Sequence, residues 1–374
     1  MFDKTNTGFK VNNFDLLRLL AATEVVCDHY FEHFHHLTDP LALKLLYLFP
    51  GVPVFFIISG YLVSASYERN RDLWVYFKNR ALRIFPGLWA CILVTVVVFS
   101  ITGINFFNKQ TLTWVPSQLM GIIYTPGFLS HYGIGSYNGS LWTITVELQF
   151  YVLLPLVYWL VPKNKVNFLL YGLLILFIVL NLVSCFYFPH NAFKGLWRTF
   201  VPYIYLFLIG VMLQRLRLYS SPWIRNKALY WIAFYVPFNL ILSSYIDPPF
   251  FSIIYGIVLA FCVLSMAYTL PDTALRLLRS NDISYGIYIY HGLIITIITQ
   301  WGLTADVDLP LLLMLSYFMA YLSWIYIERP FIRMKEKTIR YNSSVPAEKK
   351  YHSIFKLIFR HSKNLLQSPK LIDE

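Results

Sequence analysis

Charged side chains are scarce in this chain: they make up 13% of its 374 residues, against 57% hydrophobic residues. The mean hydropathy is +0.55. This composition excludes an ordinary soluble enzyme, because the apolar side chains far exceed what one soluble core can bury. Cysteine is scarce as well. The four cysteines show no Cys-x-x-Cys spacing, so the sequence indicates neither a disulfide framework nor a metal cluster.

Long apolar runs are abundant, and each is long enough to cross a bilayer. They cover approximately residues 13–34, 46–66, 84–103, 141–161, 166–187, 197–214, 228–244, 250–270, 283–301 and 309–327. The pattern predicts an all-α membrane protein with about ten transmembrane helices. We expect the first run to be an uncleaved span, because it is too long and too charged for a signal peptide. Residues 1–335 should form one transmembrane domain. The basic tail 336–374 should either include a helix on the membrane surface or be a disordered, solvated segment.

The basic residues predict the orientation. With the N-terminus in the cytoplasm, all but four of the 31 Lys and Arg residues fall on the cytoplasmic side or at cytoplasmic helix ends. The exceptions are Lys44, Lys109, Lys194 and Arg198. This is the positive-inside pattern, and it places both termini in the cytoplasm. The net charge of +12 therefore follows from topology, and the dispersed basic residues disfavour nucleic-acid binding.

The first apolar run carries two side chains that are costly inside a membrane. Arg18 and His29 lie on nearly the same helix face, within about 20°, and are separated by about 16 Å along the axis. Such residues in a span mark a functional site by default. Asp15 precedes Arg18 by one helical turn, which predicts a neutralising pair. One helix should thus carry a cation near one membrane surface and a base near the other.

Other interpretations of this run stay open. His29 can be a structural histidine, and with His33 and Glu32 it can form part of a metal site, although no third ligand is specified. We favour acid–base chemistry and predict no metal. Glu24 and Asp28 form an acidic stripe beside His29, which leaves its protonation state open.

The fourth span predicts a partner for His29. Ser140, Thr143, Glu147 and Tyr151 share one face of that helix. Glu147 and His29 both lie roughly 8–9 Å below the outer ends of their helices. A carboxylate at that depth can hold the imidazole in one tautomer. We therefore expect Glu147 to orient His29; the alternative is that Glu147 bonds to a backbone group or to another polar span.

Two arginines precede the third apolar run. Arg80 and Arg83 are one turn apart on a common face, a spacing at which forked guanidinium groups hold phosphate. Positive-inside topology explains the same residues without any ligand. Arg18, at a similar inner depth, favours an anionic ligand that enters from the cytoplasm.

Six motifs carry a resemblance to a known family. They are FDLLR at 14–18, VFFIISGYL at 54–62, RALRIFP at 80–86, GSLWTITVELQFY at 139–151, SYGIYIYH at 284–291 and ERPF at 328–331. Together with the Arg18-x10-His29 spacing, they resemble the acyltransferase-3 family of membrane O-acyltransferases, which modify bacterial surface glycans. The resemblance covers residues 12–335.

The resemblance implies a cytoplasmic acyl-coenzyme A donor, by default acetyl-coenzyme A. It implies a hydroxyl acceptor on an extracytoplasmic glycan or lipid-linked saccharide, and a multi-pass protein of the bacterial cytoplasmic membrane. The family pattern assigns importance to Arg18, His29, Arg80 and Arg83. The acyl chain, the sugar and the oligomeric state stay open.

The expected reaction combines the residues and the resemblance. Arg80 and Arg83, with Arg18, hold the coenzyme phosphates, neutral His29 takes the acceptor proton, and Glu147 orients the ring. An acyl-histidine intermediate is the alternative route. The candidates for contacting substrate or stabilising the oxyanion are Ser59, Trp142, Tyr288, Tyr290 and His291. A proton-coupled transporter or glycan exporter is the alternative function, because buried charges also line transport paths.

Overall fold

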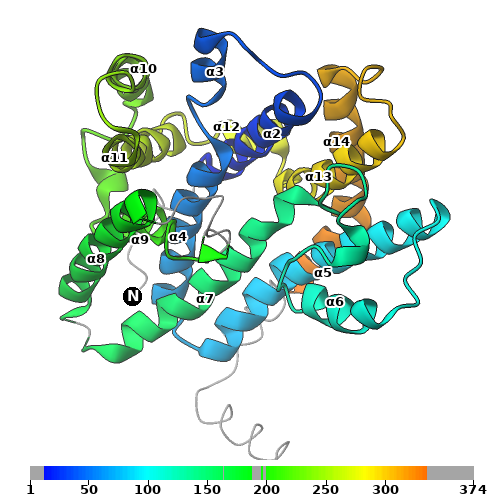
Figure 1. The fold of residues 1–374 in the computed structure, drawn as a ribbon. Coiled ribbons are helices and arrows are strands. Elements are labelled where there is room, and N and C mark those ends of the chain that lie inside the picture. The colour runs from blue at the N-terminus through cyan, green and yellow to red at the C-terminus, as the bar shows by residue number, and fades with distance from the viewer. Residues whose placement is uncertain (1–11, 163, 188–194, 197–198, 335–374) are drawn as a thin grey trace, which may run out of the picture.

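The computed structural model describes residues 12–162, 164–187, 195–196 and 199–334, and within them the chain is helical with no β-strand. Figure 1 shows the arrangement. The helices are α2 (Phe14–His33), α3 (Pro40–Leu46), α4 (Gly51–Arg69), α5 (Leu73–Ile101), α6 (Lys109–Leu119), α7 (Trp142–Leu160), α8 (Val166–Tyr187), α9 (Ile204–Arg215), α10 (Ala228–Leu242), α11 (Pro248–Ala267), α12 (Thr273–Leu278), α13 (Ser284–Gln300) and α14 (Leu309–Ser323). A π-helical turn, Trp324–Glu328, continues α14. The predicted surface helix of the tail lies outside the described residues.

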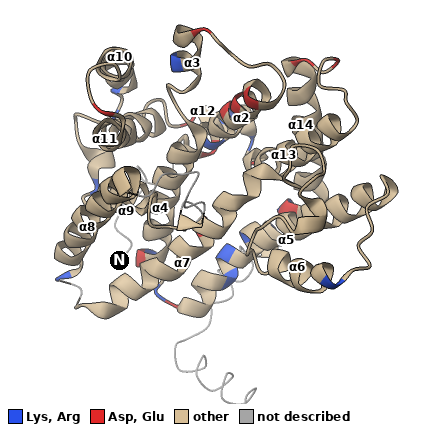
Figure 2. Cartoon of the chain, viewed as in Figure 1, with Lys and Arg blue, Asp and Glu red and all other residues tan. Residues whose placement is uncertain are grey.

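The predicted all-α membrane class is confirmed in its coarse form. Among the described residues, six helical segments are long and apolar enough to cross a membrane, and they contain α4, α5, α7, α8, α11 and α14. The other four predicted ranges also contain helices: α2, α9, α10 and α13. Helices α9 and α10 have only 12 and 15 residues. The number of crossings therefore stays a prediction. Figure 2 shows that most of the ribbon carries neither sign of charge.

Helix α5 begins eleven residues before the predicted run. Asp72 caps it by accepting a hydrogen bond from the Val75 N–H at 3.0 Å, so the helix starts at Leu73 and spans 29 residues. At 1.5 Å per residue it is roughly 43 Å long, more than the hydrocarbon core requires. Arg80 and Arg83 therefore lie inside a continuous helix rather than at its start.

Helices α4 and α9 pack closely through two glycines. A Cβ added at Gly60 would lie 2.0 Å from the Phe207 carbonyl oxygen, and one added at Gly210 would lie 2.1 Å from that of Ile57. The backbone of each helix therefore contacts a glycine of the other, at a position where a larger residue would clash. Small residues allow such approach between membrane helices, where packing replaces the hydrophobic effect as the driving force.

Helix α13 links the N-terminal and C-terminal parts of the chain. It packs against α2, α5 and α14, and Figure 1 places it between α2 and α14. Two side chains just before α7 bind the backbone of α13: Asn138 donates to the Ile289 carbonyl at 2.8 Å, and Ser140 donates to the Tyr288 carbonyl at 3.0 Å. These contacts set the position of the site residues on α13.

The acidic residues of α2 have structural partners. The Glu24 carboxylate accepts a hydrogen bond from the Gly51 N–H at 2.6 Å, at the start of α4. A carboxylate there satisfies a free helix N–H and complements the helix dipole. The Asp28 carboxylate accepts a hydrogen bond from the Tyr47 hydroxyl at 2.6 Å. The acidic stripe beside His29 thus connects α2 to the segment that enters α4.

The segment between α5 and α7 is a folded layer rather than an open polar loop. It contains α6, and Trp114 and Tyr137 are fully buried within it. The Gly133 N–H donates to the side-chain oxygen of Gln300, at the end of α13, at 2.8 Å. This layer covers the end of the bundle at which α5 ends and α7 begins.

Candidate active site

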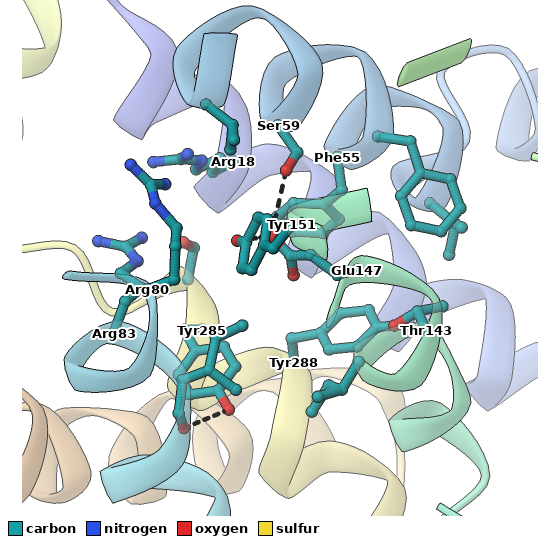
Figure 3. Close-up of a pocket in the computed structure, with 16 residues that line it drawn as sticks. Arg18, Phe55, Ser59, Arg80, Arg83, Thr143, Glu147, Tyr151, Tyr285 and Tyr288 are labelled. Carbon is teal, nitrogen blue, oxygen red and sulfur yellow. Dashed lines mark hydrogen bonds between the residues drawn. The ribbon is translucent and has the colours of Figure 1, made fainter. Parts of the chain in front are cut away.

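A pocket of about 760 Å³, counting its part open to solvent, lies where α2, α4, α5, α7 and α13 meet. Its wall consists of Arg18, Val52, Phe55, Phe56, Ser59, Val63, Arg80, Arg83, Ile84, Thr143, Ile144, Glu147, Tyr151, Ser284, Tyr285 and Tyr288. In Figure 3 the three arginines lie at one side and Tyr288 with Thr143 at the other. Five segments far apart in the sequence thus form one chamber, with three arginines at one end and the Glu147 carboxylate, hydroxyl groups and apolar side chains elsewhere.

Arg18 and Arg83 share one buried carboxylate. The Arg83 Nη2 lies 2.5 Å from the Asp282 Oδ2, and the Arg18 Nη1 lies 3.8 Å from the same oxygen. Arg18 also contacts Asp15 at 3.4 Å, which confirms the predicted pair. Burial alone would raise the pKa of Asp282, yet the guanidinium groups of Arg83 and Arg18 outweigh it and lower the pKa to about 2. Asp282, in the loop before α13, is therefore an anion at neutral pH.

Arg80 is engaged differently. Among the described residues it has no carboxylate partner, and its buried Nε makes no hydrogen bond. Its guanidinium carbon lies 5.8 Å from the Tyr76 ring centroid and 5.5 Å from that of Tyr151. The aromatic faces stabilise the cation without neutralising it. Arg80 is thus a positioned cation that retains the capacity to bind an anion.

The prediction that Glu147 orients His29 is wrong. The Glu147 carboxylate accepts hydrogen bonds from the Tyr151 hydroxyl, one turn along α7, and from the Ser59 hydroxyl at 3.2 Å. Within the described part of the chain no hydrogen bond joins it to His29. Equal depth along two helices does not determine which helices are neighbours. The alternative expectation, that Glu147 bonds to another polar span, is the one that the geometry supports.

His29 is paired instead with His291. The His29 Nδ1 lies 2.9 Å from the His291 Nε2, and the ring centroids are 5.0 Å apart. His29 is partly exposed, whereas His291 is fully buried. Spacing rules could not find this pair, because 262 positions separate its members. The described residues contain no group of three or more metal-ligating side chains, and His33 lies at a ring distance of 6.0 Å from His29.

Tyr288 lies between the pocket and the histidine pair. Its ring lines the pocket, and its centroid lies 5.9 Å from that of His291. Phe55 packs on the same ring at 5.5 Å, and the Tyr288 hydroxyl is 2.7 Å from that of Thr143. The imidazoles themselves are not part of the pocket wall.

The remaining candidates divide into two groups. Ser59 and Tyr288 line the pocket, whereas Tyr290 and Trp142 do not. Tyr290 is buried on α13, and Trp142 packs on the ring of Tyr203 at 5.2 Å. Of these four candidates, Ser59 and Tyr288 are therefore the ones whose hydroxyls a ligand in the pocket could contact.

Comparisons with known proteins agree with this membrane architecture. A family model described as an acyltransferase domain (acyltransferase-3) matches residues 11–329. Nodulation protein 10 of Rhizobium leguminosarum bv. viciae is 32% identical over 363 residues, which cover 89% of this chain and 96% of that protein. The O-acetyl transferase of Shigella phage Sf6 is 25% identical over 342 residues, covering 86% and 96%.

A more distant relative matches only in part. The peptidoglycan O-acetyltransferase OatA of Listeria monocytogenes is 28% identical over 123 residues, which cover 29% of this chain and 19% of that protein. No solved structure matches the chain. The family and the names of its members indicate an enzyme rather than the transporter considered above. The chain belongs to the acyltransferase-3 family and is a membrane O-acyltransferase.

Proposed function

We propose that this enzyme transfers an acyl group, by default acetyl, from cytoplasmic acyl-coenzyme A to a hydroxyl of an extracytoplasmic glycan or lipid-linked saccharide. The observation that carries the proposal is the pocket in which Arg80 lies with Arg18 and Arg83 and, among the described residues, has no carboxylate partner of its own. A cluster of cations at one end of a largely apolar chamber suits a ligand with a phosphorylated head and a thin acyl-bearing arm.

The proposed topology has ten crossings with both termini in the cytoplasm. It puts the ends of α2 and α5 that carry Arg18 and Arg80 on the inner side, together with Asp282 before α13. The coenzyme is a cytoplasmic metabolite, so its phosphates should meet the protein there. His29, near the other end of α2, then lies towards the outer side, where a glycan acceptor is available.

Arg80, Arg18 and Arg83 bind the donor in different ways. Arg80 forms the main phosphate contact, because no carboxylate in the described part of the chain pairs with its nitrogens. Arg18 and Arg83 add positive charge, but Asp282 holds both of them in place. The pantetheine arm lies along the apolar wall towards Tyr288. Movement of the Phe55 and Tyr288 rings then admits the thioester to His29, since both rings line the pocket and Tyr288 contacts His291.

The transfer step uses His29 as a general base. Its unprotonated nitrogen takes the proton from the acceptor hydroxyl as the hydroxyl oxygen attacks the thioester carbonyl carbon. The carbon–sulfur bond then breaks, and the coenzyme thiolate leaves and takes the proton from the imidazolium. Such a positioned base contributes a factor of about 10²–10⁴ in rate. The acyl-histidine route differs in that the imidazole nitrogen attacks first and the acceptor hydroxyl second.

The first prediction tests the donor and the base together. In membranes that contain the wild-type protein, label should pass from radioactive acetyl-coenzyme A to glycan, and His29→Ala should lower the rate by about 10²-fold or more. Protein amount and detergent-extracted folded fraction serve as controls. Equal transfer by both proteins rules out His29 as the base. Absence of transfer by the wild type, with an acceptor glycan present, rules out the donor or the acceptor class.

A further inference from the structure

The pairing of two histidines constrains where their protons lie. The His291 Nδ1 is 3.0 Å from the carbonyl oxygen of Ile287, one turn earlier in α13. A carbonyl oxygen only accepts hydrogen bonds, so the His291 Nδ1 must carry a hydrogen. In a neutral imidazole the second nitrogen then has no hydrogen and acts as an acceptor. The backbone of α13 therefore selects the tautomer of His291.

The tautomer of His291 determines the tautomer of His29. The His291 Nε2 faces the His29 Nδ1 at 2.9 Å. Because the His291 Nε2 is an acceptor when both rings are neutral, the His29 Nδ1 must donate and carry the hydrogen. The His29 Nε2 is then left with a free lone pair. This chain of hydrogen bonds leaves His29 in the one neutral tautomer that offers Nε2 as a base.

The burial of the two rings supports different roles. His291 is fully buried and is held by its own helix, whereas His29 is partly exposed. Within the described residues, no carboxylate hydrogen-bonds to either ring. In other enzymes, a group that hydrogen-bonds to the second ring nitrogen of a catalytic histidine fixes the orientation and tautomer of the ring. That group is usually a carboxylate. Here a neutral imidazole occupies that place.

We propose that His291 is the positioning residue of this enzyme: it accepts the His29 Nδ1–H, orients the ring and leaves the His29 Nε2 free to take the acceptor proton. The assignment rests on the proposed function of His29 as a base. No bond to substrate forms or breaks at His291. When His29 gains a proton at Nε2, its Nδ1–H still donates to His291, which stabilises the imidazolium.

Three variants test the assignment by kinetics. His291→Phe keeps a planar ring but removes the acceptor, and should lower kcat by about 10²-fold or more, as loss of the correct tautomer does in a catalytic triad. The KM for acetyl-coenzyme A should stay within about twofold, because His291 is not part of the donor pocket. His291→Gln retains an acceptor oxygen and should recover at least about tenfold of the lost kcat. Ser316→Ala is the matched control and should keep wild-type kcat, because Ser316 is buried in α14 and its hydroxyl donates to the Leu312 carbonyl of the same helix.

A double variant separates positioning from a purely structural role. In a His29→Gln background, His291→Phe should cause no further fall in kcat, because the residues act as a unit. An additive fall overturns the assignment, and so does wild-type kcat in His291→Phe.

A spectroscopic test is independent of acyl transfer. Nitrogen-15 NMR of histidine-labelled protein should find neutral His29 protonated at Nδ1 in the wild type and protonated at Nε2, wholly or in part, in His291→Phe. An unchanged His29 tautomer overturns the assignment. If the wild type transfers no acyl group, the proposed function fails, while the NMR result still decides whether His291 sets the tautomer.

Discussion

At the scale of single residues, the site contains cations of two kinds. Arg83 is paired with a buried carboxylate at 2.5 Å, whereas Arg80 lies near the faces of the Tyr76 and Tyr151 rings and has no carboxylate partner in the described chain. One turn of α5 separates them, and both line the same pocket. The two arginines are neighbours on one helix face but differ in their partners: Arg83 is held by Asp282, and Arg80 is available to a ligand.

This difference predicts that one alanine variant affects coenzyme A binding and the other affects stability. Arg80→Ala should weaken coenzyme A binding about tenfold to a hundredfold, since it removes a charge-assisted contact of about 1.5–3 kcal/mol. Its folded stability should change little. Calorimetry on the purified protein, with thermal unfolding in the same detergent, measures both quantities. Unchanged affinity would reject Arg80 as the phosphate contact.

Arg83→Ala should act mainly on stability, because it leaves Asp282 buried without its closest partner. The expected loss is about 1–3 kcal/mol, and the double variant Arg83→Ala/Asp282→Ala should recover part of it, since removing both partners strands no charge. Thermal unfolding of the two variants is the measurement. A double variant less stable than Arg83→Ala contradicts this account.

The residues that the sequence located correctly share a simple origin. Asp15 and Arg18 are one turn apart on a helix, so their contact is local. Arg18 and the α5 arginines were expected at a similar inner depth, and they meet because α2 and α5 line the same pocket beside Asp282. The partners of Glu147 and His29 could not be found in this way. Depth says how far along its helix a side chain lies, but the partner depends on which helices pack together and on their rotation, and α13 is remote in sequence from α2.

At the scale of helices, periodicity located the long segments but not their ends. Each predicted run contains a helix. However, α5 begins at Leu73, where Asp72 caps it, and this charged stretch is too polar to be included in a run defined by hydropathy. The short helices α3, α6 and α12 were not predicted. With 7, 11 and 6 residues, they are too short for a search that looks for membrane-spanning runs. Tertiary packing accounts for α6, whose Trp114 is buried. Helix α3 buries no side chain and starts where the Asp39 carboxylate accepts a hydrogen bond from the Ala42 N–H.

The α4–α9 contact gives the prediction at this scale. Gly60→Ala or Gly210→Ala would place a methyl group about 2 Å from a backbone oxygen of the other helix, which no rotamer change relieves. Overpacking of this kind costs about 1–3 kcal/mol, and a backbone contact belongs at the upper end of that range. Gly172→Ala in α8, where an added Cβ meets nothing within 4 Å, is the matched control. Fluorescence size-exclusion chromatography after heating should show early loss of folded protein for the first two variants only. Equal heat resistance of all three would mean that α4 and α9 lie further apart.

At the scale of the whole molecule, the proposed mechanism depends on which side of the membrane each end of the bundle faces. The pocket has its cations at one end, and the folded layer containing α6 covers the end at which α7 begins. A donor and an acceptor from opposite compartments can meet at the histidine pair only if the arginines face the cytoplasm. Orientation is therefore a condition of the chemistry, and a single experiment can test it.

Two exposed residues outside the site report the orientation. Phe107, 99% exposed before α6, should face the outside, and Leu277, 65% exposed in α12, should face the cytoplasm. In a background with the four native cysteines replaced by alanine, a membrane-impermeant maleimide should label Phe107→Cys in right-side-out vesicles and Leu277→Cys in inside-out vesicles. Retained acyl transfer in each variant shows that the fold persists. The reverse labelling would put Arg80 in the compartment that lacks coenzyme A, and would reject the cytoplasmic donor while leaving membership of the family intact.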